Sequence, residues 1–293
     1  MTRIEEFGWK GALEPGVGRI VSAHGDYYHL VCNEADGEIL ARKKKSAFSK
    51  RVTSVQESRR LKKVQRGEIG DETLTPITGD FVRFRYNAHG ESMITELLPR
   101  FSKFERKDPT ARRKSQTLAV NFDTLFIMMS LNENFSTARI DRYLDLASDM
   151  GDAEAVVVVT KMDLREEGDE EFLAELDATV ANRVAIIHIS SLTGEGMDSV
   201  MRYVSPGRTL AFIGSSGVGK STLINVLAGE EWMATQEIQE WSGKGRHTTT
   251  SRELVMLPSG AMVVDTPGIR EIGRVDEVEV LQSKGESTHR YRK

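Results

Sequence analysis

The chain has 293 residues, of which 39% are hydrophobic and 29% charged, with a formal net charge of −4 and one cysteine. This composition is typical of a globular protein of about two domains, and a lone cysteine excludes an intramolecular disulfide or a cysteine-rich zinc site. No apolar run approaches the ~18 residues of a membrane-spanning helix, and the first residues lack the apolar core of a secretory signal. We therefore expect a cytoplasmic protein without a membrane partner.

Charge is distributed unevenly along the chain. Residues 1–115 hold 23 Lys and Arg against 16 Asp and Glu, a net of +7, whereas residues 116–293 carry a net of −11. A basic first part indicates a polyanionic partner, although a solvated basic face is a common alternative.

The first part of the chain has five short strand patterns. They cover residues 17–23, 27–33, 37–42, 80–86 and 92–98. Five short strands in this length predict a small all-β barrel such as the OB-fold, placed at residues 1–99. The polar segment 43–78 interrupts them. Its basic clusters are either RNA-binding candidates or a solubilising loop, and the candidates are Arg42, Lys43, Lys44, Lys45, Arg59, Arg60, Lys62 and Lys63.

A second basic stretch, residues 100–118, is expected to be a linker, and residues 119–275 read as an α/β domain. Near-continuous apolar runs at 124–129, 154–160, 184–190 and 209–214 predict strands of a mostly parallel sheet. Helical patterns at 137–151 and 169–183 fall between them. A hairpin is expected where 252–257 and 261–265 flank a Pro-Ser-Gly turn.

The stretch "GSSGVGKST" matches the phosphate-binding loop pattern. It follows an apolar run and opens a helical pattern, which is the context that this motif requires. Lys220 is expected to reach the β- and γ-phosphates, and the Ser221 hydroxyl suits Mg²⁺. The predicted contacts in this loop are Gly214, Ser215, Ser216, Gly217, Val218, Gly219, Lys220, Ser221 and Thr222.

The stretch "VVDTPG", residues 263–268, supplies a second part of such a site. Asp265 ends a predicted strand and is expected to hold Mg²⁺ through a water. The Gly268 N–H is expected to meet the γ-phosphate, a contact that disappears on hydrolysis and is typical of a switch.

A guanine-reading pair of motifs lies before the phosphate loop. In "TKMD", which comprises Thr160, Lys161, Met162 and Asp163, the carboxylate can accept two hydrogen bonds from guanine that adenine does not offer. The Lys161 stem can lie along the base. In "SSLTGEG", Ser190, Ser191 and Leu192 begin a loop whose backbone would meet the guanine oxygen, with Ser191 in the contacting position.

The order of these motifs is the reverse of that in an ordinary small GTPase. Moving residues 120–205 from the end of such a domain to its front produces the observed order without changing any contact. Circular permutation is tolerated where the original termini lie close together at the surface. The sequence therefore predicts a circularly permuted P-loop GTPase domain.

This arrangement resembles the circularly permuted GTPases of the RsgA (YjeQ) family. The resemblance covers nearly the whole chain and includes "RIDRYL", "TKMD", "SSLTGEG", "GSSGVGKST", "GRHTTT" and "DTPG". It implies an OB-fold joined to a GTPase that acts late in assembly of the small (30S) ribosomal subunit, with hydrolysis stimulated by that subunit. It also implies GTP and GDP as ligands, rRNA as a partner, and a monomer.

Two positions in this sequence depart from the family pattern. Thr160 stands where the guanine motif usually begins with Asn. We also expect the family's usual C-terminal zinc domain to be either absent or trimmed here, because residues 276–293 have the composition of a tail and no cysteine follows Gly268. We therefore expect Mg²⁺ but no zinc in this chain.

The residue that positions the attacking water is expected in the switch stretch "GRHTTT". Ile269, directly after the D-x-x-G motif, cannot play the role of the usual glutamine. The resemblance assigns catalysis to the histidine at His247, and Lys220 is expected beside the phosphates. One threonine of the switch stretch is expected to bind Mg²⁺, and Thr250 is slightly favoured over Thr249. A loop histidine that merely contacts rRNA is the alternative.

The function that the sequence supports is GTP hydrolysis coupled to binding and release of the small ribosomal subunit. One alternative is an RNA-binding assembly factor whose site senses nucleotide but hydrolyses it weakly. The other is a P-loop kinase or ATPase, against which "TKMD" and "SSLTGEG" together argue.

Overall fold

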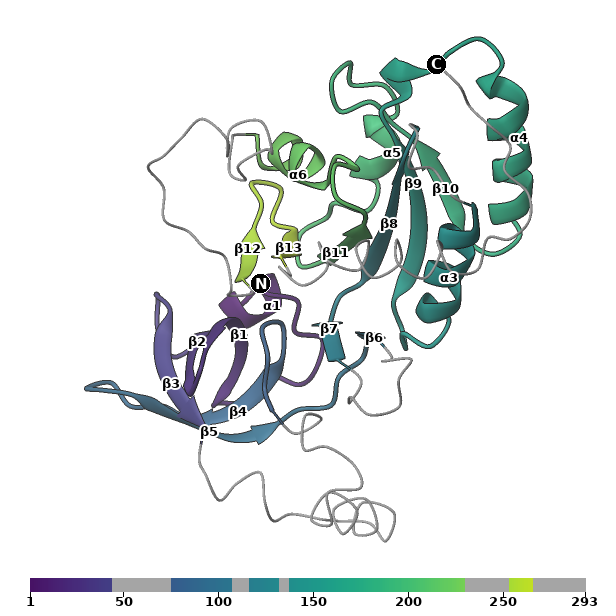
Figure 1. Ribbon diagram of the computed structural model, residues 1–293. Helices are drawn as coiled ribbons and strands as arrows, with labels where there is room; N and C mark the ends of the chain where they lie inside the picture. The colour runs from purple at the N-terminus through teal and green to yellow at the C-terminus, as the bar shows by residue number, and fades with distance from the viewer. Residues whose placement is uncertain (44–74, 107–115, 132–136, 230–252, 266–293) are drawn as a thin grey trace, which may run out of the picture.

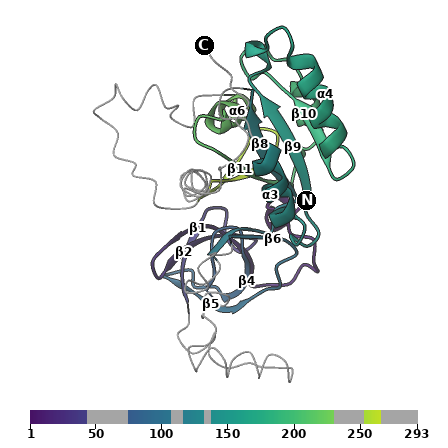
Figure 2. The same ribbon diagram turned by 45° about the vertical axis from the view of Figure 1, so that its right-hand side comes forward.

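A computed structural model of the chain describes residues 1–43, 75–106, 116–131, 137–229 and 253–265. They form a barrel joined to a layered α/β domain, with a hairpin between the two (Figures 1 and 2). No helix among these residues has the length and apolar character needed to cross a membrane.

The barrel consists of the five strands expected from the sequence. They are β1 (Val17–His24), β2 (Tyr27–Cys32), β3 (Ile39–Lys43), β4 (Phe81–Arg85) and β5 (Ser92–Leu97). Pairing runs β1-β2-β3-β5-β4, and β4 returns to β1 to close the barrel, which is consistent with an OB-fold. Alternate residues point inward to a core that includes Ile20, Leu30, Cys32, Val82 and Ile94.

The α/β domain is built on parallel strands, as the apolar runs predict. They are β8 (Thr124–Ser130), β9 (Glu154–Thr160), β10 (Ala185–His188), β11 (Thr209–Gly214) and β13 (Met262–Asp265), and the antiparallel β12 (Glu253–Met256) completes the hairpin with β13. The sheet order is β10-β9-β8-β11-β13-β12.

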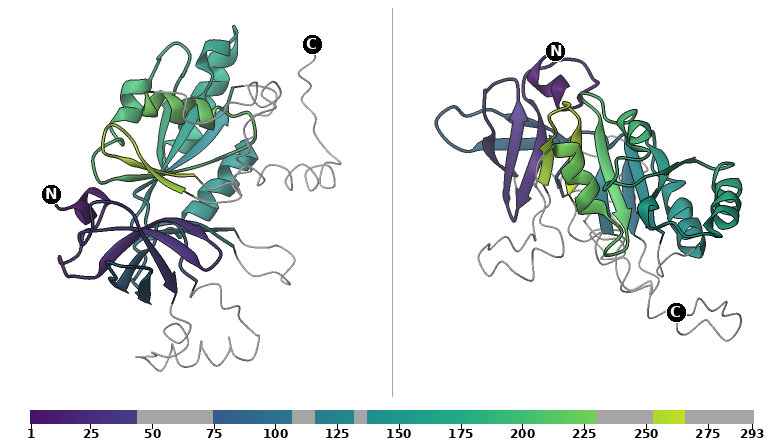
Figure 3. Two further views of the ribbon diagram at one scale, coloured as in Figure 1. Left: turned by 90° about the vertical axis from the view of Figure 1, so that its left-hand side faces the viewer. Right: turned by 90° about the horizontal axis from the view of Figure 1, so that it is seen from above.

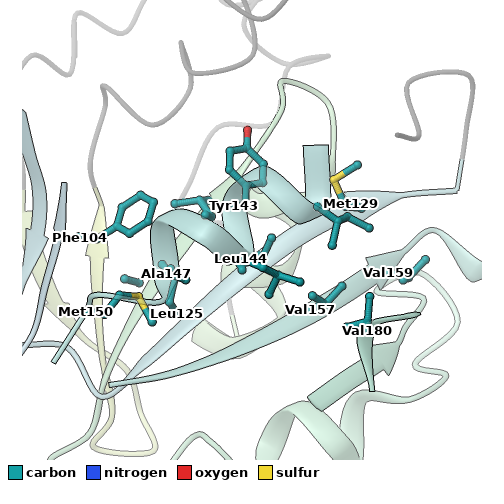
Figure 4. Packing of buried hydrophobic residues seen from close by; sticks show 14 of the residues in the cluster. Phe104, Leu125, Met129, Tyr143, Leu144, Ala147, Met150, Val157, Val159 and Val180 are labelled. Atoms are coloured by element: carbon teal, nitrogen blue, oxygen red, sulfur yellow. The ribbon is translucent and has the colours of Figure 1, made fainter. Parts of the chain in front are cut away.

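Helices cover both faces of this sheet because the strands are apolar on both sides. On one face α3 (Thr137–Ala147) and α4 (Asp169–Val180) pack over alternate residues of β8 and β9, such as Leu125, Met129 and Val157 (Figure 4). On the other face α5 (Met197–Met201) and α6 (Lys220–Ala228) cover the intervening residues, among them Phe126 and Val158.

Part of the stretch expected to be a linker forms two further strands. β6 (Lys103–Arg106) pairs antiparallel with β7 (Gln116–Val120). Phe104 and Leu118 are buried with the core under α3, so these two strands belong to the core of the α/β domain. The short helix α1 (Arg3–Glu6) and the one-turn helix η2 (Met162–Leu164) also went unpredicted.

The hairpin β12–β13 connects the two parts of the molecule. Ser22 of β1 lies opposite Glu253 of β12, so barrel and α/β domain share one 11-stranded sheet (Figure 3). Val21 and Val31 of the barrel pack against Leu254, Met262 and Val264 of the hairpin.

Arg19 is buried at this junction. Its guanidinium donates to the carbonyl oxygens of Phe7 (2.6 Å) and Asn121 (2.7 Å) and to Thr209 Oγ1 (2.9 Å). It also lies 4.8 Å from the centroid of the Phe81 ring. Burial lowers the pKa of Arg19 to about 10. Because its partners come from α1, the barrel and the α/β domain, Arg19 ties these three elements together.

Candidate functional site

The sequence motifs gather at one edge of the α/β sheet. Since β9, β10, β11 and β13 are parallel, their carboxyl ends meet there. β9 ends at Thr160, β11 at Gly214 and β13 at Asp265, and Ser190 follows the end of β10. Segments that are up to 105 residues apart in the chain thus become neighbours at the edge where open α/β sheets bind ligands.

The predicted phosphate loop is a tight turn between β11 and α6. Gly219 caps the helix with φ 92°, a left-handed conformation that favours glycine. A Cβ on Gly214 would lie 2.6 Å from the Met128 carbonyl oxygen, so the loop backbone passes too close to β8 for a side chain. Lys220 Nζ donates back to the carbonyl oxygens of Gly214 (2.7 Å) and Ser215 (3.1 Å). A lysine ammonium therefore lies over a concave loop at a helix N-terminus, which is an anion-binding arrangement.

Thr160 links the predicted guanine motif to this loop. Its side chain is 2% exposed, and its hydroxyl lies 2.6 Å from the Val218 carbonyl oxygen and 3.1 Å from that of Met129. One O–H donates to one acceptor at a time, and the shorter distance favours Val218. The threonine thus braces the loop. Neither acceptor could have been identified from the sequence, because both are backbone atoms of segments distant in the chain, the phosphate loop and β8.

Asp163 is held by the neighbouring predicted loop. The Ser190 hydroxyl donates to Asp163 Oδ1 (2.5 Å) and accepts from the backbone N–H groups of Leu192 (3.3 Å) and Thr193 (3.1 Å). The Met162 N–H also donates to the Ile189 carbonyl oxygen (3.1 Å). Lys161 adopts φ 62°, which is uncommon for a side-chain-bearing residue and sets the turn between Thr160 and Asp163.

Ser190 and Ser191, both predicted to contact the nucleotide, differ in their surroundings. Ser190 is fully buried and orients the carboxylate, whereas Ser191 is only half-buried beside it and Leu192 is 82% exposed. The carboxylate of Asp163 therefore has one oxygen engaged by a hydroxyl.

Several predicted site residues lie outside the described residues. These are His247, Thr250, Gly268, Lys44, Lys45, Arg59, Arg60, Lys62 and Lys63. Asp265 is described only as the last residue of β13. Arg42 and Lys43 are described and end β3, where Arg42 pairs with Glu91. Ser221 and Thr222 lie in the first turn of α6.

A hollow of about 760 Å³ lies at the opposite edge of the sheet. Its walls include Asp123, which directly precedes β8, and Arg208, which directly precedes β11. Lys10, from the segment after α1, also lines it. The Lys10–Asp123 ion pair (2.6 Å) and the Arg208–Glu154 pair occupy this edge. Among the residues that the structure describes, none of the predicted nucleotide contacts lies there, so the carboxyl edge is the better candidate site.

Known proteins resemble this chain over most of its length. The family model described as RsgA GTPase matches residues 97–275. The chain is 38% identical over 256 residues to the small ribosomal subunit biogenesis GTPase RsgA 2 of Lactiplantibacillus plantarum, covering 87% of this chain and 66% of that protein. It is 35% identical over 277 residues to RsgA 2 of Listeria monocytogenes, covering 92% and 71%.

Two solved structures share the fold. YjeQ from Thermotoga maritima superposes with a TM-score of 0.60 at 25% identity, covering 87% of this chain and 76% of that one. YloQ, titled a circularly permuted GTPase, superposes with a TM-score of 0.51 at 22% identity, covering 88% and 74%. The chain spans 66% of the length of the first relative named above, so it matches about two thirds of that protein.

Proposed function

The chain belongs to the RsgA GTPase family, and on that premise we propose that it hydrolyses GTP and uses its nucleotide state to time binding to and release from the small ribosomal subunit. The biological role is taken from the relatives of the chain, which are small ribosomal subunit biogenesis GTPases. The observation that carries the chemistry is the meeting of "TKMD", "SSLTGEG" and "GSSGVGK" at one sheet edge, with a direct hydrogen bond from Thr160 to Val218.

In this proposal the α/β domain is a circularly permuted P-loop GTPase domain. Asp163, oriented by Ser190, reads the guanine edge, and the stem of Lys161 lies along the base. The backbone of residues 214–219 and the Lys220 ammonium hold the phosphates. Adenine would leave the Asp163 carboxylate without its donors, so discrimination against ATP should be large.

The residues present also fit a magnesium ion. Ser221 lies in the first turn of α6, and Asp265 ends β13, which pairs in parallel with β11. A hydroxyl and a carboxylate are hard oxygen donors of the kind that Mg²⁺ prefers. When bound, Mg²⁺ neutralises charge that develops on the transferred phosphoryl group. Thr250, in the "GRHTTT" stretch that precedes β12 in the sequence, would be the third protein ligand of the ion.

His247 is proposed to orient the attacking water, since Ile269 offers no side-chain hydrogen bond. A neutral imidazole can accept the water's proton or hold it in line. Replacing His247 with Ala should leave GTP affinity unchanged and lower subunit-stimulated turnover by about 10²-fold or more. Stimulated turnover within a few-fold of the parent would transfer this role to the ribosome.

The decisive experiment measures phosphate release from GTP with and without purified small ribosomal subunits. The proposal requires turnover that rises when subunits are added and that GTP supports in preference to ATP in competition. Nucleotide binding without subunit-stimulated turnover would favour a nucleotide-sensing assembly factor, and a preference for ATP would favour a P-loop ATPase or kinase.

The barrel and the basic segment that follows β3 are proposed to contact rRNA. The +7 net charge of residues 1–115 supports this role, because phosphate contacts dominate nucleic-acid affinity. Reversing the charge at Lys43, Lys44 and Lys45 should weaken subunit binding and flatten its salt dependence without changing GTP affinity. A monomer in the cytoplasm fits this assignment.

A further inference from the structure

One row of exposed side chains crosses four neighbouring strands on the outside of the barrel. Tyr27 of β2 lies opposite Arg42 of β3, Arg42 opposite Met93 of β5, and Met93 opposite Arg85 of β4. Neighbouring strands lie about 4.8 Å apart, so the row extends over roughly 14 Å of surface. Each member points outward because a chain neighbour points into the barrel core, and these neighbours are Tyr28, Ala41, Ile94 and Phe84.

The row is exposed along its length. Tyr27 is 38% and Met93 44% exposed, the Arg42 side chain is 49% exposed, and Arg85 is also exposed. An aromatic ring and a thioether left in solvent side by side with two guanidinium groups are typical of a binding surface.

Arg42 and Tyr27 form a preorganised stack within this row. The guanidinium lies 4.3 Å from the centroid of the Tyr27 ring and also donates to the Tyr27 hydroxyl. Arg42 Nε pairs with Glu91 (2.6 Å), which fixes the side chain from a third direction. Because the guanidinium is already held over the ring, binding of a further flat group to this stack costs little additional side-chain conformational entropy.

The charge of the chain segment that follows β3 in the sequence favours a polyanion as the occupant. The chain that continues from Lys43, residues 44–74, holds nine Lys and Arg against four Asp and Glu. Flat groups interleaved with arginines suit nucleic-acid bases, whose faces stack on aromatic rings and guanidinium planes while phosphates pair with cations. In a duplex both faces of each base are already covered, so such a stack requires unpaired nucleotides.

We propose that the row Tyr27–Arg42–Met93–Arg85 is a contact surface for unpaired nucleotides of an RNA. Bases stack on the Tyr27–Arg42 pair and on Met93, and Arg85 pairs with phosphate. This proposal rests on the proposed role of the protein at the small ribosomal subunit and assigns the kind of RNA segment that the barrel takes.

The test measures fluorescence anisotropy of labelled RNA strands of about 12 nucleotides, a length within the range bound by one OB-fold, against the full chain. Tyr27→Ala and Arg42→Lys should each weaken binding about tenfold, because loss of one base stack has an effect of this size. Tyr27→Phe keeps the ring and should bind within about twofold of the parent. Arg183→Lys, an exposed arginine paired with Asp141 and Asp145 in the α/β domain, is the matched control for charge and should bind like the parent.

Three results would overturn the proposal. Variants of Tyr27 and Arg42 could bind the strand like the parent. A blunt-ended duplex of the same length could bind as well as the single strand. The variants could also lose only subunit binding while holding naked RNA, which would make the row a contact for a ribosomal protein. GTP turnover without subunits is measured in parallel, and normal turnover with unaltered RNA binding would reject the row while leaving the proposed function intact.

Discussion

Replacing Thr160 with Val should weaken guanine-nucleotide binding because it removes the brace on the phosphate loop. Valine keeps the shape and the burial of the side chain but cannot donate. In the parent, the Thr160 hydroxyl lies 2.6 Å from the Val218 carbonyl oxygen. Val218 is only 1% exposed, so in the variant this oxygen has no water to replace the lost donor. A buried acceptor left without its partner costs about 1–3 kcal/mol.

The affinity change follows from where this cost falls. The phosphate loop must hold its shape around the phosphates when nucleotide binds. Most of the free-energy cost of the unpaired carbonyl oxygen should therefore appear as a loss of binding free energy. A loss of about 1–2 kcal/mol corresponds to a 5- to 30-fold rise in the dissociation constant for GDP. Thr160→Ser keeps the hydroxyl and should stay within about threefold. Thr160→Asn restores the residue usual in the family, and its amide should also donate to the loop.

The assay is titration with a fluorescent GDP analogue, with urea unfolding as a check that each variant is folded. A Val variant that binds GDP as tightly as the parent would refute the brace. Equal weakening in the Val and Ser variants would instead assign the effect to packing of the methyl group.

Three further perturbations test other parts of the structure. Asp163→Asn should weaken GTP binding and favour xanthine nucleotides. Ser190→Ala should shift the same base preference more weakly, because it removes the hydroxyl that orients the Asp163 carboxylate. If GTP and XTP compete equally well before and after the Asp163 substitution, Asp163 does not contact the base. Arg19→Met should lower the free energy of unfolding by about 3 kcal/mol, since the carbonyl oxygens of Phe7 and Asn121 lose their donor, whereas the exposed Arg183→Met should cost less than about 1 kcal/mol in urea titrations. Burial raises the pKa of Cys32 to about 11, so at pH 8 only about one molecule in a thousand carries the reactive thiolate. Ellman's reagent should therefore label Cys32 only after unfolding, and rapid labelling of the native protein would contradict its position in the barrel core.

Most of the elements could be predicted because their signals are local. Alternation over 80–86 and the apolar runs at 124–129 and 154–160 depend on neighbouring residues only, and the strands form there. The phosphate loop could be located for the same reason, since glycines, a lysine and a following helix are contiguous in the chain. The strands β6 and β7 were missed because the high density of Lys and Arg over residues 100–114 led to the assignment of the whole stretch 100–118 to a linker, although β7 itself contains no basic residue.

The details of the candidate site needed the fold. The sequence placed Thr160 and Ser190 near a nucleotide, but the partners that define their roles are distant in the chain. Thr160 reaches the Val218 carbonyl oxygen 58 residues away, and Ser190 reaches Asp163 across 27 residues. A backbone carbonyl has no residue-type signature, so no motif can announce that it accepts such a bond.

The sequence by itself determined most of the elements, the order of the motifs and the basic character of the first part of the chain. Only the tertiary structure decided what covers each outward face of the barrel. Alternation places Arg19 and Tyr27 alike on the outside of their strands. Arg19 is nevertheless buried under α1 and the α/β domain, whereas Tyr27 remains in solvent beside Arg42. The period of a strand specifies which side chains share a face, but what packs on that face depends on chain segments far away in the sequence.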